Sequence, residues 1–376
     1  MHTYYNKRII AYVYNKINNF YEKIWLLKMM AKRKRNTNIT SKDVAALANV
    51  SQSTVSRVLN PNLEQSMISE DTAQRVREAA NQLSYSPNPI ARALRGEKTN
   101  MIGLIVREIT DPFFADLIEI INSEARKCGF NVVLGYARSD PGEGLQMARI
   151  LDSRQMDGVI FLGDLKNDKE VLQSYINEHH PIISLCRGRK IPGLPTINCD
   201  NSLGIRMLAE HLCDLGHRVI AFIDGGWFGD ILERREEFLR LKNENPKCSQ
   251  FTWIQAADDD YSGGFGVINE ILKLNPQPTA VIGSSDTLAI GLIKAATKKR
   301  IRIPEDLSIV GFDDITVAKY IQPSLTTIRQ PIEAMAKKAI EVIVKQIEGI
   351  ELSEEDLFTE LRPNLILRES TCQKTN

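Results

Sequence analysis

Residues 40–60 read TSKDVAALANVSQSTVSRVLN, a stretch that predicts two short helices joined by a tight turn. Thr40 with Asp43 three positions later is typical of a capping box, and Ser51 can cap the second helix. Asn49 and Val50 lie between them, where asparagine tolerates a left-handed backbone. This layout is that of a helix-turn-helix. The apolar residues that recur at helical spacing, and are expected where the two helices face each other, are Val44, Leu47, Ala48, Val50, Val55, Val58 and Leu59.

The second helix is predicted to expose side chains that suit contact with DNA bases. Glutamine can pair with the edge of adenine, arginine can bind N7 and O6 of guanine, and hydroxyl groups can hold phosphate. An ordinary pair of helices with a polar outer face is the alternative that this pattern alone leaves open. The side chains concerned are Gln52, Ser53, Thr54, Ser56 and Arg57.

A third helix is predicted in SEDTAQRVREAANQLSYSP, residues 69–87, where Ser69 is the cap. Its Ala73, Val76, Ala80 and Leu83 recur on one face, so three helices can close a small core. The following stretch, PNPIARALRGEKTN (residues 87–100), predicts a helix of about two turns that is too short to be stable alone in water.

The charge is divided unevenly along the chain. Lys and Arg number 16 against 7 Asp and Glu in residues 1–100, but 32 against 40 in the remainder. A basic segment joined to an acidic body is expected when one end meets phosphate. After residue 100, short apolar strands such as MIGLIV, GVIFL and LSIVGF alternate with amphipathic helical stretches. That alternation predicts a doubly wound α/β architecture with parallel sheets.

The chain resembles the lactose/galactose repressor family from about Ile39 to Thr371. The resemblance rests on motifs in the family's order and spacing, namely DVAALANVSQSTVSRVLN, YSPNPIARALRG, IGLIV, DNSLGIRMLAEHL, GHRVIAFI, GFDDI and QPSLTTIRQP. It implies an N-terminal three-helix helix-turn-helix domain with a hinge helix, followed by a two-lobed periplasmic-binding-protein-like domain. The chain would cross between the lobes three times, near residues 164–166, near 320–326 and loosely near 290.

For DNA, the resemblance implies a pseudo-palindromic operator bound by a homodimer. The hinge would become helical only on the operator, and its Leu94 would wedge into the minor groove between two base pairs. Arg92 and Arg95 would hold flanking phosphates. The DNA-binding residues predicted from motif and resemblance together are Thr40, Gln52, Ser53, Thr54, Ser56, Arg57, Asn60, Asn88, Arg92 and Leu94.

A small-molecule effector is expected at the carboxyl ends of the strands, between the lobes. The family places an effector-binding arginine at Arg234, with the adjacent Arg235 as the alternative, and an aromatic wall at Tyr261. Asp313 could instead cap the next helix. The predicted effector-binding residues are Phe113, Phe114, Arg187, Arg234, Tyr261, Ser285, Asp286 and Asp313.

Carboxylates, an arginine and aromatic faces suit a sugar or sugar derivative, with a purine or another small metabolite as the alternative. Two departures from the family pattern bear on the ligand. Cys186 stands where an aspartate is common, and Glu237 where a glycine usually precedes the aromatic residue. The function predicted is a sequence-specific transcriptional repressor of carbohydrate-utilisation genes under effector control, and a sugar-binding receptor is the weaker rival.

Four regions are expected: an N-terminal extension (1–37), the helix-turn-helix domain (38–86), the hinge and linker (87–99) and the two-lobed effector and dimerisation domain (100–376). Met29 or Met30 is the expected natural start. A cytoplasmic location is expected, because residues 1–37 lack the uninterrupted apolar core of a signal peptide and no apolar run could span a membrane.

No enzyme, cofactor or metal site is predicted, since neither catalytic nor metal-ligand motifs occur. The cysteines are expected to be free thiols: Cys128, Cys186, Cys199, Cys213, Cys248 and Cys372. No leucine heptad follows LRPNLILRES, so a dimer is expected rather than a tetramer.

Overall fold

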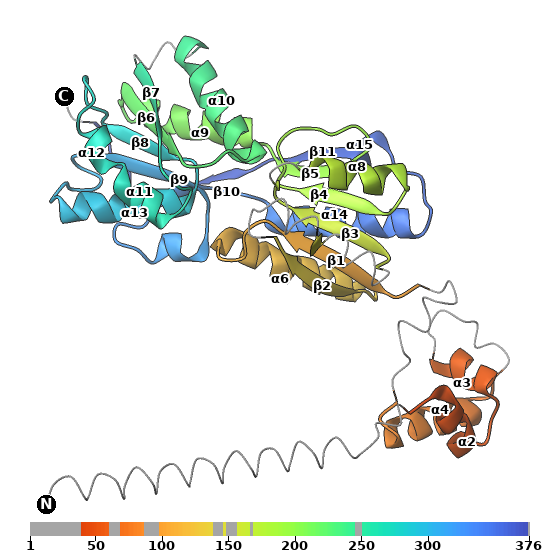
Figure 1. Cartoon of the computed structure of the whole chain (residues 1–376). Coiled ribbons are helices and arrows are strands. Elements are labelled where there is room, and N and C mark those ends of the chain that lie inside the picture. The colour runs from red at the N-terminus through yellow and green to blue at the C-terminus, as the bar shows by residue number, and fades with distance from the viewer. Residues whose placement is uncertain are drawn as a thin grey trace, which may run out of the picture. The chain divides into compact units, whose positions relative to one another are not determined.

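A computed structural model describes residues 39–59, 68–85, 98–137, 146–147, 156–165, 168–244 and 250–374. The chain divides into two compact units, Met1–Pro89 and Ile90–Asn376 (Figure 1). The predicted hinge helix falls outside the described residues.

The N-terminal unit contains three described helices, α2 (Ser41–Ala48), α3 (Gln52–Leu59) and α4 (Glu70–Gln82). The predicted capping box is present, because the Thr40 backbone N–H donates to Asp43 and the Thr40 side chain accepts from the N3 backbone. Asn49 ends α2 with a φ of 52°, the left-handed conformation expected at this turn. The Ser51 hydroxyl accepts from the backbone N–H of Thr54, and Ser69 caps α4.

A small apolar core holds these helices together. Val44, Val55 and Val76 are almost completely buried at its centre, one from each helix. Leu47 was expected to lie among them, but its side chain is 50% exposed. This prediction was wrong because α4 packs on the face of α2 that carries Val44 and Ala48. Leu47 lies beside that face and points towards solvent.

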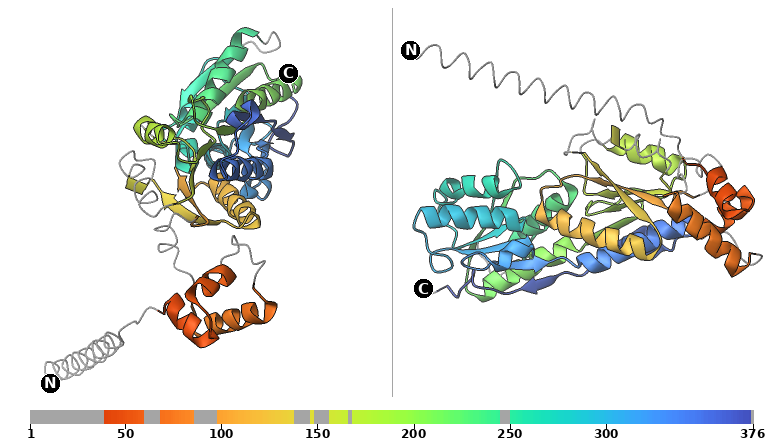
Figure 2. Two further views of the ribbon diagram at one scale, coloured as in Figure 1. Left: turned by 90° about the vertical axis from the view of Figure 1, so that its right-hand side faces the viewer. Right: turned by 90° about the horizontal axis from the view of Figure 1, so that it is seen from below.

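The second unit is built on two six-stranded sheets, each flanked by helices (Figure 2). The first sheet has the order β11-β5-β4-β3-β1-β2 and is parallel throughout. Its strands are β1 (Met101–Val106), β2 (Asn131–Tyr136), β3 (Gly158–Leu162), β4 (Ile182–Leu185), β5 (Thr196–Cys199) and β11 (Phe358–Leu361). Its helices are α6 (Pro112–Lys127), α8 (Lys169–Asn177), α14 (Ile332–Ile347) and α15 (Glu354–Leu357).

The second sheet has the order β12-β10-β9-β8-β6-β7, in which only the edge strand β12 runs antiparallel. Its strands are β6 (Val219–Asp224), β7 (Gln250–Gln255), β8 (Ala280–Gly283), β9 (Ser308–Asp313), β10 (Thr326–Arg329) and β12 (Asn364–Ile366). Its helices are α9 (Asn201–Asp214), α10 (Gly229–Glu244), α11 (Tyr261–Gly266), α12 (Ile268–Ile271), α13 (Asp286–Lys298) and the 3₁₀ helix η1 (Thr316–Lys319).

Uninterrupted apolar runs explain why these strands lie inside the unit. β3, β4 and β8 are buried at every position, as expected of parallel strands covered by helices on both faces. On one face of the first sheet, Phe161 of β3 packs with Tyr175 of α8. α14 packs on the other face, against α6 and β4. The doubly wound α/β prediction is confirmed.

The chain passes between the two sheets at three places, but not where the sequence suggested. The crossings lie between β5 and α9, between β10 and α14, and between β11 and β12. Residues 164 and 165 instead lie between β3 and β4 of the first sheet, and residue 290 lies in α13 of the second. The expected crossing at 320–326 falls short of the observed one, which follows Arg329. The apolar periodicity of a helix does not show which of the two sheets the helix packs on, so the sequence could not locate the crossings.

Cys128, Cys186, Cys199 and Cys372 are free thiols, whereas Cys213 is disulfide-bonded. The prediction that every cysteine is free was therefore wrong for Cys213, because spacing along the chain does not show which sulfur atoms the fold brings together. No described helix is both long and apolar enough to cross a membrane.

Candidate functional site

The outer face of α3 carries the side chains predicted to contact DNA. Gln52, Ser53 and Arg57 are exposed, and Thr54 and Ser56 are half-buried. The Gln52 amide donates to the Ser41 hydroxyl over 2.6 Å, so α2 orients the first side chain of α3. Within the described part of the chain Arg57 has no ion-pair partner, which leaves its guanidinium available to a ligand.

Thr40 lies at the exposed start of α2, where its hydroxyl is 2.7 Å from the Asp43 carboxylate. A hydroxyl at a helix N-terminus is suited to meet a phosphate. Four other predicted DNA-binding residues lie outside the described residues: Asn60, Asn88, Arg92 and Leu94.

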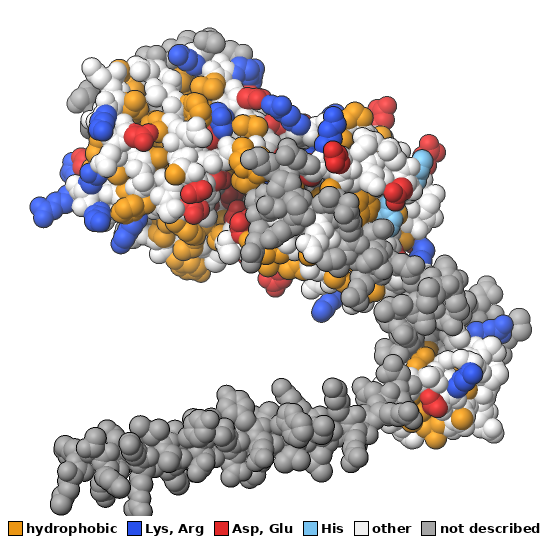
Figure 3. Space-filling view, viewed as in Figure 1, with side chains coloured by type: hydrophobic (Ala, Val, Ile, Leu, Met, Phe, Trp, Pro, Cys, Tyr) orange, Lys and Arg blue, Asp and Glu red, His pale blue; other side chains and the backbone are white. Residues whose placement is uncertain are grey.

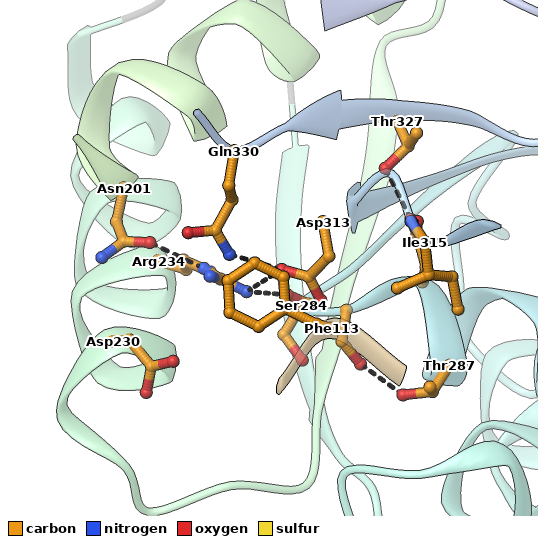
Figure 4. Close-up of polar contacts among 12 residues, drawn as sticks. Phe113, Asn201, Asp230, Arg234, Ser284, Thr287, Asp313, Ile315, Thr327 and Gln330 are labelled. Atoms are coloured by element: carbon orange, nitrogen blue, oxygen red, sulfur yellow. Dashed lines mark hydrogen bonds and ion pairs between the residues drawn. The ribbon is translucent and has the colours of Figure 1, made fainter. Parts of the chain in front are cut away.

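A second candidate site is built around Arg234 of α10 in the two-sheet unit, which is only 2% exposed (Figure 4). Its Nε donates to Asn201 Oδ1 over 2.9 Å, and its Nη1 donates to the carbonyl of Ser284 over 2.6 Å. The guanidinium carbon also lies 3.7 Å from the centre of the Phe312 ring. Helix α9 and the ends of β8 and β9 therefore fix this guanidinium at the carboxyl edge of the second sheet.

Arg235, the alternative, has a different role. It makes two hydrogen bonds to Asp224 at the end of β6, and its guanidinium lies over the Trp253 ring. These contacts hold α10 against β6 and β7, so the geometry favours Arg234 as the residue that faces a ligand.

The Asp313 carboxylate is the acidic partner of Arg234, with 3.5 Å between Oδ1 and Nη1. The same oxygen accepts from the Gln330 amide over 2.7 Å. Burial raises the pKa of Asp313 well above its ordinary value. Its backbone φ of 118° is one that residues other than glycine rarely adopt, and such strain is common at functional sites. Asp313 does not cap the helix that follows, so the alternative role of this residue as a helix cap is excluded.

The negative charges of Asp286 and Asp111 act on Asp313, and those of Asp230 and Asp111 act on the nearby Asp259. Burial raises the pKa of Asp259 to about 6 and also raises the pKa of Asp111. Asp111 caps α6 by accepting from the Phe113 backbone N–H, and Asp259 accepts from the Ser284 hydroxyl over 2.8 Å.

Both phenylalanines at the start of α6 are buried in the core, and the Phe113 ring also lies in front of Arg234 in the view of Figure 4. Arg107, at the end of β1, places its guanidinium 3.7 Å from the Phe228 ring and 3.3 Å from the Asp230 carboxylate. It therefore ties the first sheet to α10 of the second.

Arg187 is buried and already engaged by acidic side chains. It makes two hydrogen bonds to Asp168 and lies 3.6 Å from Asp164. Asp164 in turn accepts from the backbone N–H of Gly229, which begins α10. Burial raises the pKa of Asp164 to about 7. Arg187 thus supports a second contact between the two sheets.

Two predicted effector residues have structural partners instead. Asp286 is completely buried, where its carboxylate accepts from the Thr327 hydroxyl and the Ile315 backbone N–H. Ser285 caps α13. Tyr261 is 42% exposed at the start of α11, and the negative charge of Asp111 contributes to raising its pKa after burial. Asp286 therefore ties the start of α13 to β10 and to the segment after β9, whereas Tyr261 is partly open to solvent.

The two departures from the family pattern are both buried in the structure. Glu237 accepts hydrogen bonds from Arg206 and Arg240. Cys186 is buried with a left-handed φ of 55°, at the turn that leads into Arg187.

Sequence reasoning missed several residues that meet at the site. Asn201 and Gln330 lie within the quoted motifs DNSLGIRMLAEHL and QPSLTTIRQP, which was the available signal. Asp230, Asp259 and Ser284 had no local signal.

On the face of the two-sheet unit shown in Figure 3, acidic and basic side chains are interspersed, without one large field of either sign.

Comparisons with known proteins agree with this architecture. Residues 40–88 match the model for bacterial regulatory proteins of the lacI family, and residues 209–371 match that for a periplasmic binding protein-like domain. The HTH-type transcriptional repressor PurR of Actinobacillus pleuropneumoniae is 31% identical over 333 residues, which cover 88% of this chain and 98% of that protein.

Among solved structures, the lac repressor dimer bound to operator and the anti-inducer ONPF aligns with a TM-score of 0.76 and 25% identity, over 89% of this chain and 99% of that one. A LacI family transcriptional regulator from Enterococcus faecium with bound ribose aligns with a TM-score of 0.65 and 26% identity, over 73% of this chain and 100% of that one. The predicted fold and family are confirmed, and the chain belongs to the lacI family of bacterial regulatory proteins.

Proposed function

We propose that this protein represses transcription by binding operator DNA as a homodimer through α3, and that a small polyhydroxyl effector bound beside Arg234 controls its affinity for that DNA. The proposed base-reading residues are Gln52, Ser53 and Arg57, which α3 exposes together. Thr40, Thr54 and Ser56 provide hydroxyl groups for the DNA backbone.

The observation that carries the effector half of the proposal is the position of Arg234. A buried guanidinium at the carboxyl edge of a sheet, with the Asp313 carboxylate 3.5 Å away, offers both donors and acceptors to one ligand. Vicinal hydroxyl groups pair well with such groups, and an aromatic ring such as Phe113 can cover the apolar face of a sugar. The related regulator that binds ribose supports this class of ligand.

A purine or another metabolite is the second candidate. The relative named PurR covers most of the chain, so purine bases belong in the same test. The proposed effector residues are Phe113, Arg234 and Asp313, with Phe114, Arg187 and Tyr261 as support around them.

The link between effector and DNA is proposed to run through the contacts between the sheets. Arg107 meets Asp230, and Asp164 meets Gly229, so each contact joins the first sheet to α10. A ligand that favours one spacing of the sheets shifts the equilibrium between two arrangements, and this changes DNA affinity only if the two arrangements bind DNA differently.

The chain is proposed to act in the cytoplasm, without catalytic activity, with a DNA-binding domain over residues 38–86, a hinge over 87–99 and an effector domain over 100–376. Leu94 in the hinge is the proposed minor-groove wedge.

The test is fluorescence anisotropy of the full-length protein on labelled DNA from upstream of its own gene, at fixed salt, with neutral sugars, sugar derivatives and purine bases added in turn. We expect a sugar to release the wild-type protein. Arg234→Lys should still bind DNA but lose the response, because an ammonium lacks the planar fork through which the guanidinium reaches Asn201, Ser284 and a ligand together.

The matched control is Arg302→Ala, which removes an exposed arginine that pairs with Asp306 and should respond normally. Release by a purine base instead of a sugar would replace the polyhydroxyl effector with the second candidate. Absence of DNA binding on any fragment of the upstream region would overturn the assignment of α3.

A further inference from the structure

The site around Arg234 contains more acidic than basic side chains. The carboxylate of Asp111 interacts electrostatically with each of three others there, those of Asp230, Asp259 and Asp313. Only two guanidinium groups meet them among the described residues, Arg107 at Asp230 and Arg234 at Asp313. Asp111 and Asp259 form no ion pair within the described part of the chain.

Each of these carboxylates also has one oxygen in use and one left over. Oδ1 accepts from the Phe113 N–H in Asp111, from Arg107 in Asp230, from Ser284 in Asp259 and from Gln330 in Asp313. The Oδ2 atoms accept no hydrogen bond from the described residues, and none of them is a buried atom without a partner. They therefore line space that solvent reaches.

Asp230 is largely shielded from bulk water. The residue is only 6% exposed, and in Figure 4 its carboxylate projects from α10 into the space below Arg234 and Phe113. Its unused Oδ2 can accept a hydrogen bond from a donor that a ligand brings. The buried guanidinium of Arg234 is an independent sign that this space is built to bind a polar molecule.

The imbalance selects the charge of the ligand. Burial already raises the pKa of Asp111, Asp259 and Asp313, so ionising these groups in the folded protein costs free energy. An anionic ligand such as a sugar phosphate would add negative charge to the group. A protonated amine would balance the surplus and donate up to three hydrogen bonds to the unused oxygens.

We propose that the effector is an amino-substituted polyol, such as an amino sugar, whose ammonium group lies between Asp111 and Asp259 while its hydroxyl groups meet Arg234 and Asp313. This inference rests on the proposed function, because it specifies the ligand class of the same site.

The experiment measures the thermal stabilisation of the full-length protein by matched probes at about pH 7, where a sugar amine is largely protonated. Each series contains the neutral sugar, the amine, the N-acetylated amine and the phosphate, for instance D-glucose, D-glucosamine, N-acetyl-D-glucosamine and D-glucose 6-phosphate, with the galactose series alongside. Adenine and hypoxanthine complete the panel.

In at least one series we expect the amine to bind about tenfold more tightly than the neutral and acetylated members, and the phosphate to bind worst. Asp259→Asn and Asp111→Asn should bring the amine and the neutral sugar close to equal affinity. Asp258→Asn changes an exposed carboxylate next to Asp259 and should keep the preference.

A neutral sugar that binds as tightly as its amine would overturn this inference and leave the proposed function standing. An amine preference that survives both Asp111→Asn and Asp259→Asn would also overturn it. If none of the sugar probes stabilises the protein, both the inference and the polyhydroxyl effector are wrong.

Discussion

The Nη1 atom of Arg234 and the Oδ1 atom of Asp313 lie 3.5 Å apart, and both side chains are almost completely shielded from solvent. Arg234 comes from α10 and Asp313 from the end of β9, so the pair joins a helix to the strand edge beneath it. Hydrogen bonds to Asn201 and Ser284 hold the Arg234 guanidinium in this position, and a hydrogen bond from Gln330 holds the Asp313 carboxylate.

Removing one member of this pair should be costly. Arg234→Ala leaves the buried Asp313 carboxylate without its cationic partner, and we expect a loss of about 3–5 kcal/mol in the free energy of unfolding of the two-sheet unit. The double variant Arg234→Ala/Asp313→Ala should be less destabilised than the two single changes added together. Urea denaturation followed by circular dichroism measures all three, and strict additivity would show that the pair does not interact.

The two proposed kinds of DNA contact should separate in binding assays. Arg57→Ala should relax the preference for operator over random DNA by about 1–3 kcal/mol, because it removes a base contact. Lys42→Ala should weaken binding to every sequence alike, since Lys42 is exposed on α2 and has only a charge to offer. Anisotropy titrations on both DNAs at several salt concentrations distinguish the two effects, and equal effects of Arg57→Ala on operator and random DNA would show that it does not read bases.

Gly229 should be essential to the contact between the sheets. A methyl group at Gly229 would overlap the carbonyl oxygen of Arg187, and Gly229→Ala should therefore disturb this contact by about 1–3 kcal/mol and weaken the response to effector. Gly266→Ala is the matched control, because a methyl group there meets nothing within 4 Å. Effector titrations of both variants bound to DNA supply the comparison, and an unchanged response in Gly229→Ala would mean that the sheets need not approach here.

The stability of the two-sheet unit should fall as the pH rises. Burial raises the pKa of Asp286 from 3.8 to about 8, so the folded protein holds a proton that the unfolded chain releases. Stability is then greatest below about pH 4 as far as this group is concerned, and is lost progressively up to about pH 8. Melting temperatures between these limits should decline less steeply in Asp286→Asn than in the wild type.

Asp306→Asn is a suitable control for this pH effect, because Asp306 is exposed and its pKa is lowered to about 2 by Arg302. It is ionised throughout the range and should not change the slope. Identical slopes for Asp286→Asn and the wild type would mean that Asp286 titrates normally.

The sequence predicted best what depends on neighbouring residues. The Thr40 and Asp43 capping box, the left-handed Asn49 and the Ser69 cap are each made within about four residues, so their signals are local. The apolar strand runs likewise predicted buried parallel strands. Leu47 was misplaced because helical spacing indicates an apolar stripe without saying how far round the helix the partner reaches.

What only the tertiary structure decided is which distant segments meet. The partners of Arg234 come from residues 201, 284 and 313, and the carboxylate of Asp286 is occupied by Thr327 and Ile315, far along the chain. Whether an aspartate at a strand end faces a ligand or satisfies a buried donor depends on those neighbours. The sequence by itself determined the helix-turn-helix and the α/β class, because local spacing carries that information, and Arg234 became a candidate through the resemblance to the repressor family. The crossings between the sheets and the acidic surplus at the site follow from long-range packing, which no local pattern encodes.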